Sequence, residues 1–483
     1  MEDRVAMTVI ASRCFTAEDQ TAFAAFSGDH NPMHMDPVAA RRTQAGAPVV
    51  HGVHMLLWAL DRLAASGLPM ADVASIAVQF SKFAYLDQPI TLTLIRHDER
   101  SAAAELARDG LAVSTVVLRF GPRADPAVPR DIMDAPDITT ADPAPNAPTI
   151  EDIASMGGWM APVSDRAAAL QIAPALVDAL GLPRVRGMGL LSRLVGMICP
   201  GLHSIFTGIR VDLTSAVSER AGVGFSVAIL DQRFRVARVK VAGDGIAGTI
   251  SAALRWAPVE APSLDALALH VKRDQFAGSL ALIVGGSRGL GALTAKLLAL
   301  GGARVVVTYA TGEAEATALA AELNDRFGST TCRTARVDVL SDLAPQLAAL
   351  PTGIDRMYYF ATTRIFRAKR ALFDPEQFSE FNRVYVDAFH QVCRFLMNAN
   401  GSLSAFYPSS VAVSERPELM TEYAMSKAAG EILCADLAQH LPGFKVVAER
   451  LPRMLTDQTA TITPVESAEP LGVMLPLICS VQA

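Results

Sequence analysis

A buried strand, a glycine-rich turn and a helix follow one another at residues 279–300 and restrict how the second half of this 483-residue chain can fold. Residues 279–284, Ser-Leu-Ala-Leu-Ile-Val, form an apolar run suited to a strand that is buried on both faces. The turn reads Gly-Gly-Ser-Arg-Gly-Leu-Gly at 285–291, and glycines at a helix start let backbone amides approach a pyrophosphate. With a further strand at 304–308, the pattern predicts a Rossmann-type, doubly wound parallel α/β sheet that binds a dinucleotide.

The strand at 304–308 also bears on which dinucleotide would bind. No acidic residue ends it, because the chain continues as Tyr-Ala-Thr-Gly. A carboxylate at that point would hold the ribose hydroxyls of NAD, and Arg288 in the turn is available to meet a phosphate. The sequence therefore favours NADPH (NADP) as cofactor, the alternative interpretation of Arg288 being a solvated surface charge.

Three polar residues further on suggest proton transfer to a carbonyl. Tyr423 and Lys427 stand four residues apart and share one face of a predicted helix. A nearby ammonium favours the phenolate, so that the phenol could give its proton to a carbonyl while a hydride arrives. Ser410, at the end of a predicted strand, could hydrogen-bond the same carbonyl.

The glycine-rich turn, Ser410, Tyr423 and Lys427 together resemble the short-chain dehydrogenase/reductase family over about residues 275–483. The resemblance implies that Asp338 contacts the adenine and that Thr456 lies near the nicotinamide. The cofactor-binding positions that it implies are Gly285, Ser287, Arg288, Gly289, Leu290, Gly291, Asp338, Ala361, Tyr423, Lys427 and Thr456.

The chain departs from the family's pattern in three places. Residues 359–362 read Tyr-Phe-Ala-Thr where the family has Asn-Asn-Ala-Gly, and Arg453 replaces a glycine. The family's fourth catalytic residue, an Asn, is not placed: Asn382 has the right distance from Ser410, but Val384 and Tyr385 align better locally.

A polar loop near the N-terminus suggests a second chemistry. Residues 27–34 read Ser-Gly-Asp-His-Asn-Pro-Met-His, which places Asp29 five residues before His34 in a segment that cannot form a regular helix. A carboxylate and a neutral imidazole can hold one water between them and move its protons, as adding water to a double bond, or removing it, requires. The alternative interpretation is a solvated turn or a capping cluster.

The loop, with His51 and Gly52 before an apolar helix predicted at 53–65, resembles the MaoC-like (R)-specific enoyl-CoA hydratases over about the first 120 residues. The resemblance implies that Asp29 and His34 are catalytic and that Asn31, His51 and Gly52 face the substrate, the Gly52 amide holding the thioester oxygen. It also implies an α+β hot-dog fold, in which antiparallel strands wrap the helix. We predict these strands at 74–83, 89–97, 100–107 and 111–120.

The pattern returns in weaker form later in the first half. Gly243-Asp244-Gly245 precedes a predicted strand much as Arg108-Asp109-Gly110 does, so we infer an internal repeat and a double hot-dog in which the second copy lacks the Asp-x4-His loop. His203 in that copy is interpreted as a capping or core histidine. The predicted domains are 1–121 (catalytic hot-dog), 122–150 (Pro-rich linker), 151–257 (degenerate hot-dog), 258–278 (linker) and 279–483 (dehydrogenase/reductase).

Composition limits the partners. A formal net charge of −6 gives no reason to expect nucleic acid or an anionic membrane, and neither a secretory signal nor a bilayer-spanning run is evident, so we expect a cytoplasmic protein. The six cysteines are scattered, which predicts no metal site. From the resemblance we expect a homo-oligomer acting on thioesters of coenzyme A or of an acyl carrier protein.

The two chemistries are consecutive steps, which predicts a bifunctional ketoreductase (an oxidoreductase) and dehydratase (a lyase). A 3-ketoacyl thioester would become a 3-hydroxyacyl and then a trans-2-enoyl thioester, as in fatty-acid or polyketide-like biosynthesis. Two alternatives remain open. Hydration followed by oxidation would serve breakdown, and a non-catalytic acyl-binding hot-dog module would leave only the reductase active.

Overall fold

The computed structural model describes residues 7–124, 128–138, 144–217, 220–367, 371–457, 459 and 465–483. The chain divides into two compact units, with the boundary between Ala257 and Pro258. Within the described ranges, no helix combines the length and the apolar character that crossing a bilayer requires.

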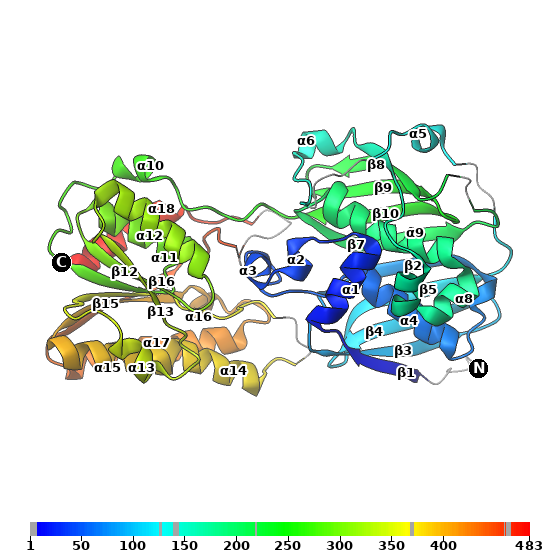
Figure 1. The fold of residues 1–483 in the computed structure, drawn as a ribbon. Helices are drawn as coiled ribbons and strands as arrows, with labels where there is room; N and C mark the ends of the chain where they lie inside the picture. The colour runs from blue at the N-terminus through cyan, green and yellow to red at the C-terminus, as the bar shows by residue number, and fades with distance from the viewer. Residues whose placement is uncertain are drawn as a thin grey trace. The chain divides into compact units, whose positions relative to one another are not determined.

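One antiparallel sheet of ten strands forms the first unit (Figure 1). Its strands are β1 (Thr8–Cys14), β2 (Val73–Phe80), β3 (Pro89–His97), β4 (Ser101–Arg108), β5 (Leu111–Phe120), β6 (Gly157–Met160), β7 (Ser204–Leu213), β8 (Val223–Asp231), β9 (Val236–Gly243) and β10 (Ile246–Leu254). Their spatial order is β1-β3-β4-β5-β2-β7-β10-β9-β8-β6. Read outward from the central β2–β7 pair, both halves follow the same order, which supports the internal repeat.

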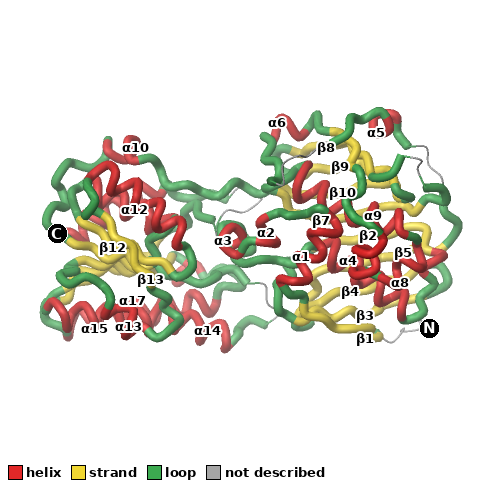
Figure 2. Tube along the Cα trace, viewed as in Figure 1, coloured by secondary structure: helices red, strands yellow, loops and turns green. Residues whose placement is uncertain are grey.

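Two long helices lie on one face of this sheet, as Figure 2 shows for α4 and α9. Helix α4 (Gly52–Ala65) confirms the helix predicted at 53–65, and its apolar side chains fill the unit's core. Helix α9 (Leu182–Arg193) packs against α4 and continues into a single π-helical turn, η2 (Leu194–Ile198). A π-turn inside a helix is frequent at functional sites.

Short helices complete the first unit. Thr16 caps the first of them through a capping box with Asp19. The proline-rich segment packs Ile132 against Trp159 in a small core cluster. The short helices are α1 (Ala17–Ser27), α2 (Pro32–Met35), α3 (Pro37–Ala40), η1 (Met70–Asp72), α5 (Arg130–Met133), α6 (Ile150–Ile153), α7 (Arg166–Ile172) and α8 (Pro174–Leu180).

The second unit is a six-stranded parallel sheet with the order β13-β12-β11-β14-β15-β16. Numbered within the unit this is 3-2-1-4-5-6, the order of dinucleotide-binding sheets, so the predicted doubly wound fold is confirmed. The strands are β11 (Leu280–Val284), β12 (Arg304–Tyr309), β13 (Cys332–Arg336), β14 (Arg356–Tyr359), β15 (Leu403–Ser410) and β16 (Phe444–Leu451).

Helices cover both faces of the parallel sheet, and alternate residues of β11 enter two separate cores. Ala281 and Ile283 pack with α11, α12 and α18, whereas Leu282 and Val284 pack with α13, α15 and α17. The helices are α10 (Leu264–Ala268), α11 (Gly289–Leu300), α12 (Glu313–Phe327), α13 (Leu343–Ala348), α14 (Pro375–Asn382), the π-turn η3 (Arg383–Asp387), α15 (Ala388–Asn400), α16 (Ala412–Glu415), α17 (Thr421–His440) and α18 (Pro470–Gln482).

Candidate active sites

The turn between α1 and α2 directs Asp29 into the first unit. Gly28 ends α1 with φ 77°, and a Cβ there would lie 2.9 Å from the Arg193 Cδ, so the turn needs glycine both for its backbone and for its space. Asn31 then caps α2, whose first residue is Pro32. Asp29 is consequently only 2% exposed, although its neighbours in sequence belong to a polar loop.

The second half of the unit holds the Asp29 carboxylate. Ser192 of α9 donates its hydroxyl proton to Oδ2 at 2.7 Å, while the Asn31 backbone amide donates to Oδ1 at 3.1 Å. A Cβ at Gly196 in η2 would collide with both carboxylate oxygens. Burial raises the pKa of Asp29, and the charge of His34 and the Ser192 hydrogen bond oppose that rise.

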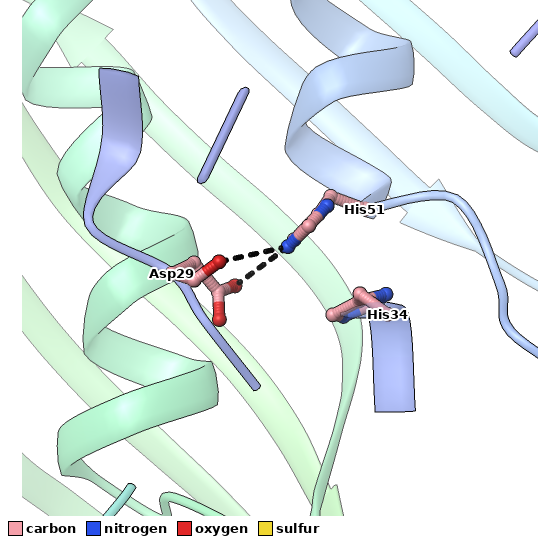
Figure 3. A group of neighbouring side chains, drawn as sticks. All are labelled: Asp29, His34 and His51. Atoms are coloured by element: carbon pink, nitrogen blue, oxygen red, sulfur yellow. Dashed lines mark hydrogen bonds and ion pairs between the residues drawn. The ribbon is translucent and has the colours of Figure 1, made fainter. Parts of the chain in front are cut away.

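His51 is neutral, and its tautomer follows from its hydrogen-bond neighbours. The Gln20 amide nitrogen Nε2 donates to the Val49 carbonyl at 3.1 Å and also lies 2.9 Å from His51 Nδ1. Because an amide nitrogen can only donate, Nδ1 is the acceptor. The proton is then on Nε2, which donates to the Asp29 carbonyl at 3.1 Å and lies 3.8 Å from its Oδ2 (Figure 3). Burial lowers the pKa of His51 well below its usual value, which keeps the ring neutral.

His34 has one ring nitrogen, Nε2, without a hydrogen bond among the described residues. Its Nδ1 lies 2.8 Å from the Val49 carbonyl, which can only accept, so Nδ1 carries the proton and Nε2 keeps its lone pair. The ring stacks on His51 at 3.9 Å between centroids (Figure 3). Unlike Asp29 and His51 it is only half-buried, so Nε2 can serve as a base toward a bound molecule.

The cluster is arranged for acid–base work and does not fit a metal ion. Side-chain ligand atoms of Asp29, His34 and His51 lie within 4.8 Å of one another. However, both nitrogens of His51 are engaged, and each Asp29 oxygen already accepts a hydrogen bond. One free imidazole nitrogen beside a buried carboxyl is a proton-transfer pair.

The remaining residues predicted for this site have structural partners of their own. Asn31 accepts from the Met33 amide at 3.0 Å and donates to the Gly196 carbonyl at 2.7 Å, which fastens the loop to the second half. Gly52 begins α4, and a Cβ there would lie 3.1 Å from the Phe80 ring. The amide of Gly52 therefore stands at a helix start beside an aromatic wall.

Sequence reasoning missed Ser192, Gly196 and Gln20. Ser192 and Gly196 come from the copy without a catalytic loop, and Gln20 comes from the helix that precedes the loop. The one available signal was the internal repeat, which placed two helices side by side without saying which of their residues meet.

In the second unit the glycine-rich turn connects β11 to α11. A Cβ at Gly285, whose φ is 78°, would lie 2.8 Å from the Ala361 amide nitrogen, and one at Gly291 would strike the Gly285 carbonyl oxygen. By contrast, a Cβ at Gly289 would meet no atom within 4 Å. The start of α11 thus faces open space, as a cradle for a pyrophosphate requires.

The structure brings Ser410, Tyr423 and Lys427 together as predicted. Ser410 ends β15, and its hydroxyl bonds the phenol of Tyr423 on α17; burial raises the pKa of Tyr423 to about 12, against the effect of that bond. The ammonium of Lys427, one turn further along α17, donates to the Pro408 carbonyl at 2.6 Å. Burial lowers the pKa of Lys427 to about 7.

Tyrosine rings surround Lys427. Its Nζ lies 4.0 Å from the ring centroid of Tyr385, 5.1 Å from that of Tyr407 and 5.7 Å from that of Tyr423. Tyr385 belongs to the π-turn η3, whereas Asn382 is the last residue of α14. Sequence reasoning considered both positions and did not decide between them.

The outer cofactor-binding positions are engaged within the protein. Arg288 pairs with Asp457 at 2.8 Å. Asp338 accepts from the Leu340 amide at 3.0 Å and the Ser341 hydroxyl at 2.7 Å, which stabilises the turn after β13. The Thr456 amide donates to the Thr459 hydroxyl at 2.8 Å.

The chain thus carries a cluster of Asp29, His34 and His51 on an antiparallel unit, and a cluster of Ser410, Tyr423 and Lys427 on a Rossmann unit. Residues 3–113 match the family model described as MaoC like domain, and residues 279–466 match that described as short chain dehydrogenase. The chain therefore joins a MaoC-like domain to a short-chain dehydrogenase domain.

Individual proteins share shorter or weaker similarity with the chain. It is 49% identical over 42 residues to an (R)-specific enoyl-CoA hydratase of Aeromonas caviae, a stretch covering 9% of this chain and 31% of that protein. A putative short chain dehydrogenase from Escherichia coli CFT073, solved with NADPH, is 22% identical at a TM-score of 0.39, covering 44% of this chain and 93% of that one. FolM alternative dihydrofolate reductase 1 from Brucella suis, solved with NADP, is 19% identical at 0.34, covering 37% and 74%.

Proposed function

We propose that the chain is a bifunctional enzyme that reduces a 3-ketoacyl thioester to the (R)-3-hydroxyacyl thioester and dehydrates that product to the trans-2-enoyl thioester. The observation that carries the proposal is the presence of both sites in one chain, since the product of the proposed reductase site is the substrate of the proposed dehydratase site. The acyl group would be carried by coenzyme A or by an acyl carrier protein.

For the dehydration, His34 Nε2 takes a proton from C2 of the 3-hydroxyacyl group, and the C3–O bond breaks as protonated Asp29 gives its proton to the leaving hydroxyl. The products are an enoyl thioester and water. A carboxyl with a raised pKa suits the acid role, and the half-buried lone pair of His34 suits the base role. The amide of Gly52, at the start of α4, would hold the thioester oxygen as charge develops.

For the reduction, C3 of the ketone would accept a hydride, which a bound reduced nicotinamide would supply. Tyr423 gives its phenolic proton to the carbonyl oxygen, and Ser410 orients that oxygen through a hydrogen bond. Lys427 stabilises the phenolate that remains and would hold the nicotinamide ribose. Gly289 would leave room for the pyrophosphate at the start of α11, while Gly285 and Gly291 let the backbone of the turn pack closely.

NADPH is the proposed cofactor. The end of β12 and the residues after it, Thr308 to Gly312, carry no carboxylate to hold the ribose hydroxyls of NAD. Arg288, paired with Asp457, would turn toward the 2′-phosphate when NADPH binds. Titration with NADPH and NADH should give at least a tenfold lower Kd for NADPH; equal values would contradict this part of the proposal.

The first unit is proposed to be a double hot-dog with one active copy. Support comes from the repeated strand order and from the contacts that Ser192 and Gly196 make with Asp29. In place of a second catalytic loop this copy has α7 and α8, and the Leu176 backbone amide in the first turn of α8 donates to Asp61 of α4 at 3.1 Å. A homo-oligomer is proposed from the family resemblance.

Product analysis tests the whole proposal. The protein is given NADPH and 3-ketobutyryl thioesters of coenzyme A and of an acyl carrier protein, and the products are identified by mass. Accumulation of the 3-hydroxybutyryl thioester alone would contradict the dehydratase role, and no consumption of either thioester would contradict the reductase role. Asp29→Asn should stop the sequence at the 3-hydroxy product.

A further inference from the structure

The surroundings of Lys427 contain an unusual feature: its ammonium has one hydrogen-bond acceptor among the described residues and an aromatic face where another polar partner would be expected. The Pro408 carbonyl accepts one N–H at 2.6 Å. The Tyr385 ring stands 4.0 Å from Nζ, well inside the distance at which a cation and an aromatic face attract each other. Lys427 is 4% exposed, so water does little to replace missing partners.

Tyr385 is itself fixed from several sides. Its ring stacks on Phe381 with centroids 5.7 Å apart and meets Tyr423 edge-on at 5.6 Å. Its hydroxyl lies 2.6 Å from the Thr362 hydroxyl in the loop that follows β14. The π-turn η3 carries Tyr385, and Tyr359 steadies that turn by donating to the Val384 carbonyl at 2.6 Å. The aromatic face is therefore held against Lys427 by the fold and is not a passing side-chain contact.

We propose that Tyr385 is a positioning residue of the reductase site, whose aromatic face holds the Lys427 ammonium charged and aimed past Tyr423. The inference rests on the proposed ketoreductase function. One N–H is directed to Pro408 and one to the Tyr385 face, which leaves the third for a bound ribose. A polar side chain in the same place would compete for that third N–H, whereas a ring face does not.

The cation–π contact opposes the cost of burying the charge. Burial alone lowers the pKa of Lys427 toward neutrality, and a neutral amine could not stabilise the Tyr423 phenolate. Removing the ring should lower that pKa further, because the ring interacts with the charged form only. The titratable groups that face Lys427 are Tyr385 on η3, Tyr407 on β15, and Tyr423 and Cys434 on α17; Glu431, one turn further along α17, is paired with Arg450.

The test compares Tyr385→Met with Tyr385→Phe. Met fills a similar volume without an aromatic face, and Phe keeps the face but loses the hydroxyl. Phe389→Met is the matched control, since Phe389 packs against Tyr359 and Tyr407 in the same core. The titration of Lys427 is followed by NMR of 13C-labelled lysine in cofactor-free protein, with Lys427→Arg identifying the signal, and the pH profile of kcat for ketone reduction is measured in parallel.

In Tyr385→Met the Lys427 titration and the alkaline limb of kcat should move down by about 0.5–1.5 pH units, while Tyr385→Phe and Phe389→Met stay near the wild type. An equal shift in Tyr385→Phe would overturn the inference, as would the absence of a shift in Tyr385→Met. If Tyr385→Met does not fold, Tyr385→Leu takes its place against the same two controls. If the titration shifts as expected but the wild type reduces no ketoacyl thioester, the proposed function fails while the role of Tyr385 stands.

Discussion

At the scale of single residues, the first site depends on how three protons are placed. Gln20 sets the tautomer of His51, the Val49 carbonyl sets that of His34, and Ser192 bonds the buried Asp29. A carboxyl whose pKa is raised by burial can give up and take back a proton near neutral pH more readily than it would in water, and the accepting nitrogen of His34 lies close to it.

Asp29→Asn should abolish hydration of a crotonyl thioester without weakening the fold. Loss of a general acid–base group costs about 10²–10⁴ in rate. Because the pKa of Asp29 is raised, the folded state disfavours its charge at neutral pH, so a neutral amide should leave the free energy of unfolding unchanged or larger. Loss of enoyl absorbance measures the activity and thermal unfolding measures the stability.

The control for that experiment is Asp36→Asn. Asp36 caps α3 in the same segment but is exposed, and it accepts from the Val38 amide at 2.7 Å. It should retain hydration activity. A fully active Asp29→Asn protein, or equal losses in both variants, would contradict the assignment of Asp29.

Ser192→Ala should move the pH profile of hydration. The Ser192 hydrogen bond lowers the pKa of Asp29, so its removal should raise that pKa further. Hydration uses the ionised carboxylate, so the acid limb of kcat/KM should shift to higher pH by the same amount. Ser204→Ala is the matched control, because Ser204 donates to the Val195 carbonyl at 2.7 Å and does not contact Asp29. Equal profiles for Ser192→Ala and the wild type would count against this role.

At the scale of elements, the sequence predicted the features that depend only on residues close together in the chain. The helix at α4, the strand and turn before α11, and the pairing of Tyr423 with Lys427 on one helix face all follow from spacing within a short segment. Ser192 contacts Asp29 across 163 positions of sequence, and spacing within a short segment cannot predict a contact between residues so far apart. Tyr385 was missed as a partner of Lys427 for the same reason, because the two residues lie on different elements, η3 and α17.

Gly196→Ala should inactivate the first site through its effect on Asp29. A Cβ at Gly196 would overlap the carboxylate, which must then leave its place beside Ser192 and His51. We expect at least a hundredfold loss of hydration with ketone reduction unchanged. Gly187→Ala on α9 is the control, since a Cβ there meets the Asp244 Cβ at 3.1 Å and no residue of the site. Retained hydration in Gly196→Ala would show that the contact is not needed.

At the scale of the molecule, the buried imidazoles should make the first unit sensitive to acid. Burial lowers the pKa of His54 to about 3 and that of His51 well below 6.5. In the unfolded chain both rings bind protons below about pH 6.5. In the folded protein they bind protons only at a much lower pH. Their stabilisation is therefore complete above pH 6.5 and lost as pH falls, by up to about 1.4 kcal/mol per pH unit for each ring. Asp29, with a raised pKa, acts in the opposite direction near its own titration.

Urea unfolding between pH 7.5 and 5 measures this slope. The three tryptophans, Trp58, Trp159 and Trp256, all belong to the first unit, so their fluorescence reports that unit. His54→Gln should reduce the slope at the acid end of this range by up to about 1.4 kcal/mol per pH unit, because the amide cannot titrate. An unchanged slope would mean that His54 is protonated, or exposed, in the folded unit.

The two sites should work as separate catalysts, with the 3-hydroxyacyl thioester leaving one site before it is used by the other. The described residues of each site come from one unit: Asp29, His34 and Ser192 from the first, and Ser410, Tyr423 and Lys427 from the second.

A protein with Asp29→Asn and another with Tyr423→Phe should each lack one reaction and keep the other. Mixed at equal concentration with a 3-ketobutyryl thioester and NADPH, they should form the enoyl product after a lag, because the hydroxyacyl thioester must leave one protein and reach the other. At matched site concentration the wild type should show the same lag, measured by quenching and mass analysis. A wild-type reaction without a lag would instead mean that the intermediate passes between the sites before it is released.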